Sequence, residues 1–307
     1  GSGTFLVVDI QKVLETLSEE TKEEKLEKVL ERVKGFDLNP LSVLTARVNY
    51  FVNIAHFLEP NKSTKLHIPI YLGDSSYVPE PVTIENIECL SYRIKTLKGY
   101  IDVTLPKGMI INSGAFSEMM IELEYDIKSL DWKVVSERIK AVASKAQLTP
   151  AIEEKIDLLA QKFVELEKNE WNGIWARIVT NFLTTASIGR FDLIVGNPPW
   201  VDWKNLPAGY RERIKSLCIS RHLFSGDRVT GGINLNICAL IASVVADNWL
   251  KDNGILGFLM PQNLLLLQTY EGFRNFYQAS GERLYFQKFF DWTKSGHPFQ
   301  PVQHKFL

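Results

Sequence analysis

Apolar residues recur at helical spacing near the start of the chain, where a polar turn separates two such stretches. The pattern predicts a glycine turn and a short helix over residues 1–17, then a second helix over Thr21–Val33. Thr21 and Glu24 stand three residues apart at the start of that helix, which is the spacing of a capping box. The charged residues between its apolar positions are expected to face solvent.

Two short apolar runs surround a third helix and predict a β-α-β unit. The runs are Phe36–Leu38 and Ile68–Leu72, each too short for a helix. Asn39 and Pro40 suit the N-cap and the first position of the helix between them. That helix, Leu41–Phe57, is apolar on most of its faces and is therefore expected to be buried. The alternation predicts a parallel sheet and the α/β fold class.

The pattern changes character from about residue 76 to residue 170. Tyr92–Leu97 and Tyr100–Leu105 alternate weakly around a Lys-Gly pair, which predicts a hairpin. Thr149 then begins a long amphipathic helix with one apolar stripe. We interpret residues 76–170 as an insertion into the sheet domain, and the pattern assigns it no function.

The last part of the chain returns to alternating helices and strands. Its predicted elements are a helix over Trp171–Ala186, a strand over Phe191–Gly196, a buried helix over Asn234–Leu250 that ends at Asp252-Asn253-Gly254, and strands over Ile255–Met260 and Leu284–Asp291. This order is again typical of a parallel sheet with helical crossovers.

Composition excludes several classes of protein. The chain has 307 residues, 45% of them hydrophobic, which is enough to bury a sizeable core. Its 35 basic and 36 acidic residues nearly cancel, so no basic field covers the whole chain, although a local basic groove could still bind nucleic acid. No apolar stretch reaches the ~18 residues of a membrane span, and no signal peptide opens the chain. The protein is therefore expected to be cytoplasmic, without a membrane partner.

The cysteines give no sign of a disulfide framework or a metal site. Cys89, Cys218 and Cys238 are widely spaced and form no CxxC pair. An odd count without such spacing is typical of reduced thiols in the cytoplasm. No cluster of His, Asp and Cys has ligand spacing either, so no metal is expected.

The sharpest chemical signal is Asn197-Pro198-Pro199-Trp200, directly after a predicted strand. Proline has a fixed φ and no backbone N–H, so this corner presents a rigid set of acceptors, the Asn197 side-chain oxygen and the Pro198 carbonyl. The two oxygens can accept both hydrogens of an –NH2 group, and Trp200 offers a face for a planar base. The same residues also occur in ordinary turns, and Trp200 could belong to the core. The position favours a ligand site, because α/β folds bind ligands at the carboxyl ends of parallel strands.

Three earlier segments could hold a nucleoside cofactor. Gly1-Ser2-Gly3-Thr4 allows a tight turn into a helix and a close backbone approach, although Gly-Ser-Gly is also a typical linker remnant. Asp37 follows a strand after one helical crossover, where an acidic side chain can accept both ribose hydroxyls. The interval between the glycine turn and Asp37 exceeds the usual ~20 residues, and the additional helix between them accounts for the excess. Asp74 ends the next strand, where it could accept the amino hydrogens of an adenine or form a simple turn.

Together these segments resemble the class I, adenine-specific (N6) DNA methyltransferases of the gamma arrangement, in which cofactor motifs precede the catalytic motif. The end of that family's Asp-Pro-x-Cys-Gly-Ser-Gly-x-Phe-Leu loop is similar to Gly1-Ser2-Gly3-Thr4-Phe5-Leu6. Its ribose-binding segment is similar to Gly35-Phe36-Asp37-Leu38-Asn39-Pro40. Its adenine-binding segment is similar to Leu72-Gly73-Asp74-Ser75. Phe191 to Trp200 resembles the catalytic motif, and Gly254 to Pro261 the later strand beside the target-base pocket. Val201-Asp202-Trp203-Lys204-Asn205-Leu206-Pro207 and the insertion are similar to the methyltransferases of type IIG restriction–modification enzymes and BREX-type phage defence systems.

The resemblance implies a Rossmann-like class I sheet, S-adenosyl-L-methionine as cofactor and DNA as partner. It assigns residues 1–75 to the cofactor-binding half, 76–170 to a large insertion before the catalytic strand, and 171–307 to the catalytic half. The implied cofactor-binding residues are Gly1, Ser2, Gly3, Thr4, Asp37, Leu38, Asp74 and Ser75. The implied catalytic residues, which would hold an adenine flipped out of the duplex, are Asn197, Pro198, Pro199 and Trp200.

This chain also departs from the family pattern. The Asp-Pro-x-Cys portion, the first strand and the target-recognition domain are missing. The chain is therefore expected to be a fragment of a longer enzyme, whose remaining part could include a specificity domain or a nuclease domain.

Two alternative functions stay open on the sequence alone. The same amino-group chemistry could act on guanine in RNA or on a glutamine side chain in a protein. Those enzymes share the Asn-Pro-Pro-aromatic motif but are usually shorter and lack a large insertion. The chain could also be a catalytically inactive methyltransferase-like module that binds DNA or a partner, although the intact Asn197, Asp37 and Asp74 disfavour this interpretation.

Overall fold

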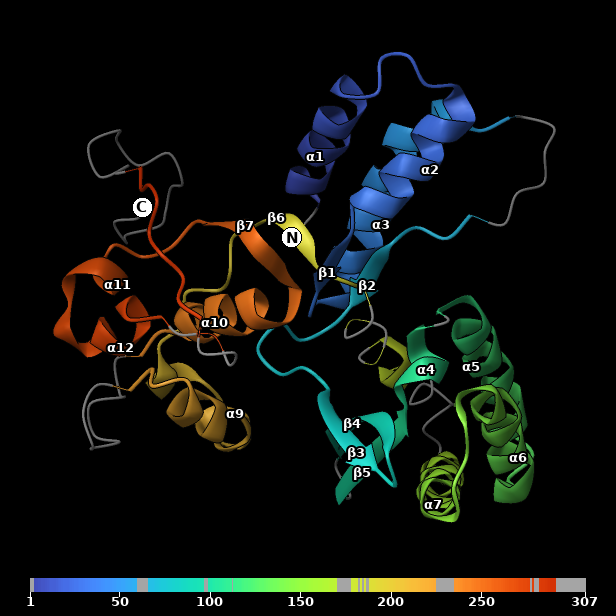
Figure 1. Cartoon of the computed structure of the whole chain (residues 1–307). Coiled ribbons are helices and arrows are strands. Elements are labelled where there is room, and N and C mark those ends of the chain that lie inside the picture. The colour runs from blue at the N-terminus through green and yellow to red at the C-terminus, as the bar shows by residue number, and fades with distance from the viewer. Residues whose placement is uncertain are drawn as a thin grey trace. The chain divides into compact units, whose positions relative to one another are not determined.

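The computed structural model describes residues 3–59, 66–96, 99–111, 113–169, 178–181, 183, 185, 188–224, 235–276, 278 and 282–290. The protein is a mixed α/β molecule of two compact units, whose elements are labelled in Figure 1. The first unit comprises Gly1–Asp74 and Val78–Ile188, and the second comprises Ser75–Tyr77 and Gly189–Leu307. Among the described residues, no helix combines the length and the apolar character needed to cross a membrane.

The first unit begins with the predicted helices and the predicted β-α-β motif (Figure 1). Its elements there are α1 (Thr4–Glu15), α2 (Lys22–Arg32), β1 (Gly35–Asp37), α3 (Pro40–Ile54), the 3-10 helix η1 (Ala55–Phe57) and β2 (Ile70–Leu72). β1 and β2 are parallel, with Gly35 opposite Ile70 and Asp37 opposite Leu72. The carboxyl ends of both strands therefore lie at the same edge of the pair.

Side chains cap two of these helices at the predicted positions. Glu24 N donates to Thr21 Oγ1 at 3.3 Å, and Thr21 N donates to Glu24 Oε2 at 2.8 Å, which completes the capping box of α2. Leu41 N donates to Asn39 Oδ1 at 2.9 Å, with Pro40 at the first position of α3. Local sequence therefore determines where both helices begin.

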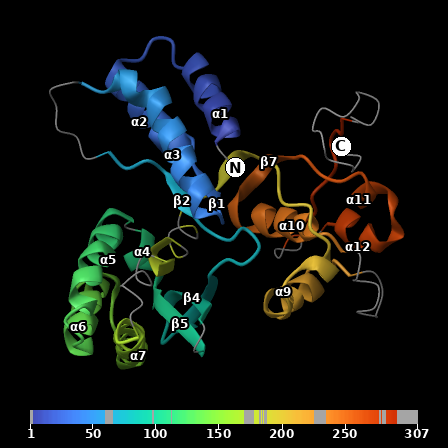
Figure 2. The same cartoon turned by 180° about the vertical axis from the view of Figure 1, so that it is seen from behind.

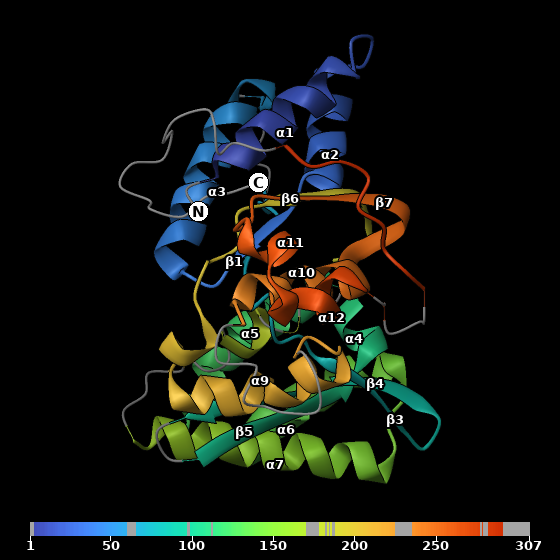
Figure 3. The same cartoon turned by 90° about the vertical axis from the view of Figure 1, so that its left-hand side faces the viewer.

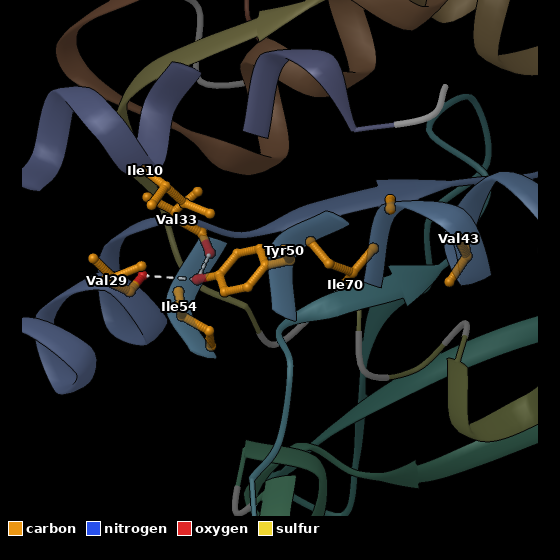
Figure 4. Close-up of a cluster of buried hydrophobic side chains, with 8 residues drawn as sticks. Ile10, Val29, Val33, Val43, Tyr50, Ile54 and Ile70 are labelled. Carbon is orange, nitrogen blue, oxygen red and sulfur yellow. Dashed lines mark hydrogen bonds between the residues drawn. The ribbon is translucent and has the colours of Figure 1, made fainter. Parts of the chain in front are cut away.

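A hydrophobic cluster joins α1, α2, α3 and β2, and Tyr50 lies at its centre (Figure 4). Tyr50 is fully buried, and its hydroxyl lies 3.0 Å from the carbonyl oxygens of both Val29 and Val33. The cluster consists of Ile10, Val29, Val33, Val43, Ala46, Tyr50, Ile54 and Ile70. The Tyr50 hydroxyl thus binds α3 to the end of α2, just before β1 begins.

The expectation that α3 is buried on most of its faces is wrong. One face packs into the core, whereas apolar residues elsewhere on the helix are between 43% and 69% exposed. These exposed residues are Leu41, Leu44, Val48, Phe51 and Val52. A helix needs only one apolar stripe to pack against a neighbour, so the remaining apolar positions do not indicate burial.

The region after the first parallel pair forms an antiparallel sheet with helices (Figure 3). The strand order is β3 (Glu80–Ile84), β4 (Ile87–Thr96) and β5 (Gly99–Pro106). β4 and β5 are the predicted hairpin, whereas the sequence pattern does not predict β3. The turn from β3 to β4 consists of Glu85 and Asn86, with φ of 47° and 66°. This pair lacks the glycine that usually marks such a turn, so the turn carries no clear sequence signal.

Helices follow this sheet and pack on it and on one another. They are α4 (Lys107–Ile111), α5 (Ser113–Ile127), α6 (Trp132–Ala143), the 3-10 helix η2 (Ser144–Ala146) and α7 (Pro150–Glu167). α7 packs against β5 and α6, and its predicted apolar stripe is buried. Of the helix predicted over Trp171–Ala186, residues 171–177, 182, 184 and 186 lie outside the described residues, and residues 178–181, 183 and 185 are helical.

The second unit, seen from behind in Figure 2, holds another parallel strand pair, and both of its strands are labelled in Figure 1. Its elements are β6 (Phe191–Gly196), η3 (Trp203–Asn205), α9 (Ala208–Ser220), α10 (Ile237–Trp249), β7 (Leu250–Phe258), α11 (Asn263–Leu266), η5 (Gln268–Tyr270) and α12 (Glu271–Arg274). β6 and β7 run parallel, with Gly196 opposite Phe258, and α10 packs against β7. α10 is buried over most of its length, as its continuous apolar run predicts.

One boundary and one strand in this unit differ from the prediction. α10 ends at Trp249 and β7 begins at once at Leu250, because Asp252-Asn253-Gly254 forms an irregularity inside the strand and does not end the helix. The strand predicted over Leu284–Asp291 is wrong for residues 284–290, and Asp291 lies outside the described residues. A strand needs a neighbouring strand to take its hydrogen bonds, and an apolar run alone does not supply one.

The described strands pair as β1 with β2, β3 with β4 and β5, and β6 with β7. The two parallel pairs belong to different units. The mixed α/β class is therefore confirmed, whereas a single Rossmann-like sheet stays a prediction.

Candidate active site

The Asn-Pro-Pro-Trp segment is the loop that leaves β6 at its carboxyl end. β7 runs parallel to β6 and ends beside it, and Leu259 N donates to Gly196 O at 3.1 Å. Two strand ends and their following loops are thus held together by backbone hydrogen bonds. The loop occupies the kind of position at which α/β proteins bind ligands.

The first residues of this loop divide into accessible and buried ones. Asn197 and Pro199 are exposed, whereas Pro198 is buried. Neither proline has a backbone N–H to donate, so the corner presents oxygen acceptors only, apart from the Asn197 amide. Within the described part of the chain, the Asn197 side chain makes no hydrogen bond to protein, and its amide is accessible.

Trp200 is held in place by the neighbouring strand end. Its Nε1 donates to Leu259 O at 3.2 Å, and its ring is partly exposed. Because Leu259 is itself bonded to Gly196, the indole is fixed relative to the end of β6. A planar aromatic ring that is partly exposed and held in a fixed orientation can stack on a planar base.

The residues after Trp200 are fastened to the start of α10. Ile237 N donates to Val201 O at 2.9 Å, and Asp202 pairs with Asn236 in an isolated antiparallel bridge. Asn236 Nδ2 also donates to Asp202 Oδ1 at 3.2 Å. Trp200 is therefore held by the residue after β7, and the segment that follows it is held by the start of α10.

Asn236 is a positioning residue that the sequence reasoning does not single out. Its Oδ1 accepts from Cys238 N at 3.2 Å and caps α10, while its amide nitrogen holds Asp202. Only 6% of Asn236 is exposed. An asparagine before an apolar helix is a known cap signal, but the predicted helix begins two residues earlier and so hides it.

In the first unit, Asp37 and Asp74 come from neighbouring strand ends. Gly73 N donates to Asp37 O at 3.1 Å, so the segment before Asp74 lies against β1. Asp37 Oδ1 accepts from Asn39 N at 2.8 Å, which orients the carboxylate at the start of α3. Leu38, between them, is 55% exposed. The structure thus brings together the two predicted acidic positions of this half.

Asp74 is buried, with 5% of its surface exposed, and Gly73 before it fits a tight space. A Cβ added at Gly73 would lie 2.4 Å from Thr185 Cγ2, closer than such atoms approach. Ser75, the next residue, is partly buried and belongs to the second unit. Glycine is therefore required here by close packing.

Of the predicted glycine loop, Gly1 and Ser2 lie outside the described residues. Gly3 has φ of 91°, a left-handed conformation that favours glycine, and it is the N-cap of α1. A Cβ at Gly3 would lie 3.2 Å from Ala46 Cα, so the start of α1 packs closely on α3. Thr4, the first helical residue, is exposed. The glycine therefore makes the sharp entry into a helix that the sequence predicts.

The thiols and acidic groups give little support to other chemistry. Burial raises the pKa of Cys218 to about 12, and it raises the pKa of Cys89 and Cys238 as well. Such thiols are poor nucleophiles because the thiolate is the reactive form. Among the residues that the structure describes, no group of three or more His, Cys, Asp or Glu could hold a metal ion.

Comparison with protein-family models gives a match over most of the chain. A family model described as Eco57I restriction-modification methylase matches residues 31–299, a range that includes Asp37, Asp74 and the Asn197–Trp200 loop. No curated protein and no solved structure gives a significant match.

Proposed function

Because the chain belongs to the Eco57I restriction-modification methylase family, we propose that this DNA methyltransferase acts on the exocyclic amino group of adenine and takes the methyl group from S-adenosyl-L-methionine. The observation that carries the proposal is the loop after β6, which presents an accessible Asn197 amide next to a fixed Trp200 ring. The family match supports DNA as the substrate over RNA guanine or protein glutamine.

Asn197 and Pro198 bind the amino group in this proposal. The side-chain oxygen of Asn197 and the carbonyl oxygen of Pro198 each accept a hydrogen bond from one N–H group of the adenine amino group. Accepting both hydrogens draws the nitrogen towards tetrahedral geometry and leaves its lone pair directed away from the loop. Pro199 follows without an N–H, so no backbone donor competes at this corner. Asn197 therefore contributes orientation and electrostatics to the reaction.

Trp200 would bind the flipped base by stacking. A base taken out of a duplex loses its stacking with neighbouring bases, and an aromatic face returns ~1–3 kcal/mol of it. Because Trp200 Nε1 is bonded to Leu259 O, the ring needs little further ordering when the base arrives.

The chemistry of the predicted cofactor-binding residues fits a nucleoside cofactor. S-Adenosyl-L-methionine, when bound, supplies a methyl group on a positively charged sulfur. Asp37 would accept the ribose hydroxyls, and Asp74, with Ser75, would accept the amino hydrogens of the cofactor's adenine. Leu38, which is exposed at the strand end, would cover the adenine ring. Gly1, Ser2, Gly3 and Thr4 would also contact the cofactor, and the left-handed conformation of Gly3 lets the backbone turn tightly into α1 at this point.

The proposal is tested with labelled S-adenosyl-L-methionine and a panel of acceptors. The protein is incubated with amplified DNA that carries no methylated bases, with ribosomal RNA, and with a peptide-release factor. Transfer of label to DNA is expected, and transfer to RNA or to the release factor instead would favour the alternative substrates. Binding of the cofactor in calorimetry without transfer to any acceptor would indicate an inactive module.

A matched pair of variants links the activity to the loop. Asn197→Ala is expected to abolish transfer to DNA while cofactor binding is retained. Asn248→Ala serves as the control, because Asn248 Nδ2 donates to Val244 O within its own helix and lies outside the loop. Equal activity of the two variants would contradict the role of Asn197.

A further inference from the structure

The three residues after Asp74 belong to a different unit from the residues on either side of them. Ser75–Tyr77 groups with Gly189–Leu307, whereas Gly1–Asp74 and Val78–Ile188 form the other unit. The chain therefore passes from the first unit into the second directly after a proposed cofactor-binding carboxylate, and it returns three residues later. A segment as short as Ser75–Tyr77 needs specific contacts to hold it in the second unit.

Ser76 provides the first of these contacts. It is fully buried, at 0% exposure, and its Oγ forms a hydrogen bond with the hydroxyl of Tyr210 on α9. A buried hydroxyl is costly unless it has a partner, so this pair specifies where Ser76 lies.

Arg213 provides the second contact. Its guanidinium lies 4.7 Å from the ring centroid of Tyr77 and 4.9 Å from that of Tyr210. Arg213 stands one helical turn after Tyr210 on α9, so both side chains project from the same face of the helix. The Arg213 cation therefore interacts both with the ring of Tyr77 and with the ring of Tyr210 on α9.

From these contacts we propose that Tyr210 and Arg213 are positioning residues for the cofactor's adenine, and that they act through Ser76 and Tyr77. The inference rests on the proposed function, in which Asp74 and Ser75 accept the adenine amino hydrogens. Ser76 lies two residues after Asp74, and two residues span at most ~7 Å, so fixing Ser76 on α9 limits the positions open to the Asp74 backbone. In this proposal Tyr210 and Arg213 act only through Ser76 and Tyr77 and not by contact with the cofactor.

The same contacts give α9 a part in cofactor binding. α9 begins at Ala208, shortly after the loop that carries Asn197 and Trp200.

The test compares cofactor binding with and without the adenine amino group. The ligands are S-adenosylhomocysteine and its analogue in which hydrogen replaces the 6-amino group of the purine. Calorimetry is run on the wild-type protein, Tyr210→Phe, Arg213→Met and Arg211→Met, the last being a control that removes the same charge from the same helix. Tyr210→Phe is expected to weaken binding of S-adenosylhomocysteine about fivefold, the effect of one lost hydrogen bond, and to leave binding of the analogue nearly unchanged.

Kinetics supply the second readout. In Tyr210→Phe and Arg213→Met the KM for S-adenosyl-L-methionine is expected to rise, while kcat at saturating cofactor stays near the wild-type value. Arg213→Lys, which keeps a cation over the two rings, should recover most of the affinity. If Tyr210→Phe does not fold at the assay temperature, Ser76→Ala removes the other partner of the same hydrogen bond.

The outcomes separate this inference from the proposed function. If the wild-type protein prefers the amino-bearing ligand and the variants keep that preference in full, the positioning role is wrong and the proposed function stands. Equal weakening of both ligands together with a lower Tm would also overturn it, because that result describes a purely structural contact. If the wild-type protein binds neither ligand, the proposed function fails, and this inference fails with it.

Discussion

Replacing Gly73 by alanine perturbs the end of β2 at the residue before Asp74. The added Cβ would lie 2.4 Å from Thr185 Cγ2. Thr185 is 3% exposed, so its side chain has little room to move away. The backbone of the Gly73 segment, which is bonded to Asp37 O, must shift instead. The substitution therefore tests the packing that positions a proposed cofactor-binding carboxylate.

The expected size of the effect follows from the contact. Overpacking of this kind costs ~1–3 kcal/mol. Each kcal/mol lowers the Tm of a domain of 150–250 residues by about 2–4 °C, so Gly73→Ala should lower the Tm by about 2–12 °C. Thr185→Ser removes the Cγ2 methyl and keeps the hydroxyl, so it should relieve most of the strain. The double variant should therefore show a favourable coupling energy of about 1 kcal/mol or more.

The assay is thermal unfolding of the wild-type protein, both single variants and the double variant, with cofactor affinity measured on each. Gly257→Ala is the control, because its Cβ would lie at an ordinary 3.6 Å from Val195 Cγ1. Cofactor affinity should fall in Gly73→Ala and recover in the double variant. A Gly73→Ala protein that unfolds at the wild-type temperature, or additive effects in the double variant, would refute the close contact.

Three further predictions concern the proposed base-binding loop and two helix caps. Trp200→Phe keeps a ring but loses the donor to Leu259 O, and it should lower kcat/KM about tenfold at most. Trp200→Ala should lower kcat/KM by about 5- to 150-fold more than Trp200→Phe does, because it also removes ~1–3 kcal/mol of base stacking. Equal losses of kcat/KM in the two variants would argue against stacking. Asn236→Ala should destabilise the protein by about 0.5–2 kcal/mol in urea unfolding through the lost cap of α10. Asn236→Ser, which keeps a capping oxygen and places no second carboxylate beside Asp202, should recover part of this loss. Hydrogen bonds from the backbone and the side chain of Thr21 lower the pKa of Glu24. The contribution of the ionised Glu24 to folding stability is therefore present above the pKa of ~4.3 of an unfolded glutamate, and it is lost as the pH falls through the lowered pKa. The Tm difference between wild type and Glu24→Gln should accordingly shrink in acid.

The parts of the fold that follow from the sequence are those with local causes. Thr21 and Asn39 begin α2 and α3 because their side chains bond backbone groups two or three residues ahead. The Asn197–Trp200 loop falls at a strand end because prolines end the ladder. These features need no knowledge of the rest of the chain.

The parts that the sequence does not predict depend on partners distant in the chain. The exposed face of α3 looks like core by composition, and nothing local distinguishes Phe51 from the buried Tyr50. β3 is paired through a turn without glycine. The contact of Ser76 with Tyr210 joins residues 134 positions apart, and serine carries no pattern that announces such a contact. Tertiary pairing decides each of these cases.

Analysis of the methylated nucleoside tests the central claim most directly. DNA incubated with S-adenosyl-L-methionine and either the wild-type protein or Asn197→Ala is digested to nucleosides and examined by mass spectrometry. We predict N6-methyladenine with the wild-type protein and none with the variant. Methylated cytosine, or N6-methyladenine in equal amounts from both proteins, would contradict the assignment of Asn197 as the residue that holds the adenine amino group.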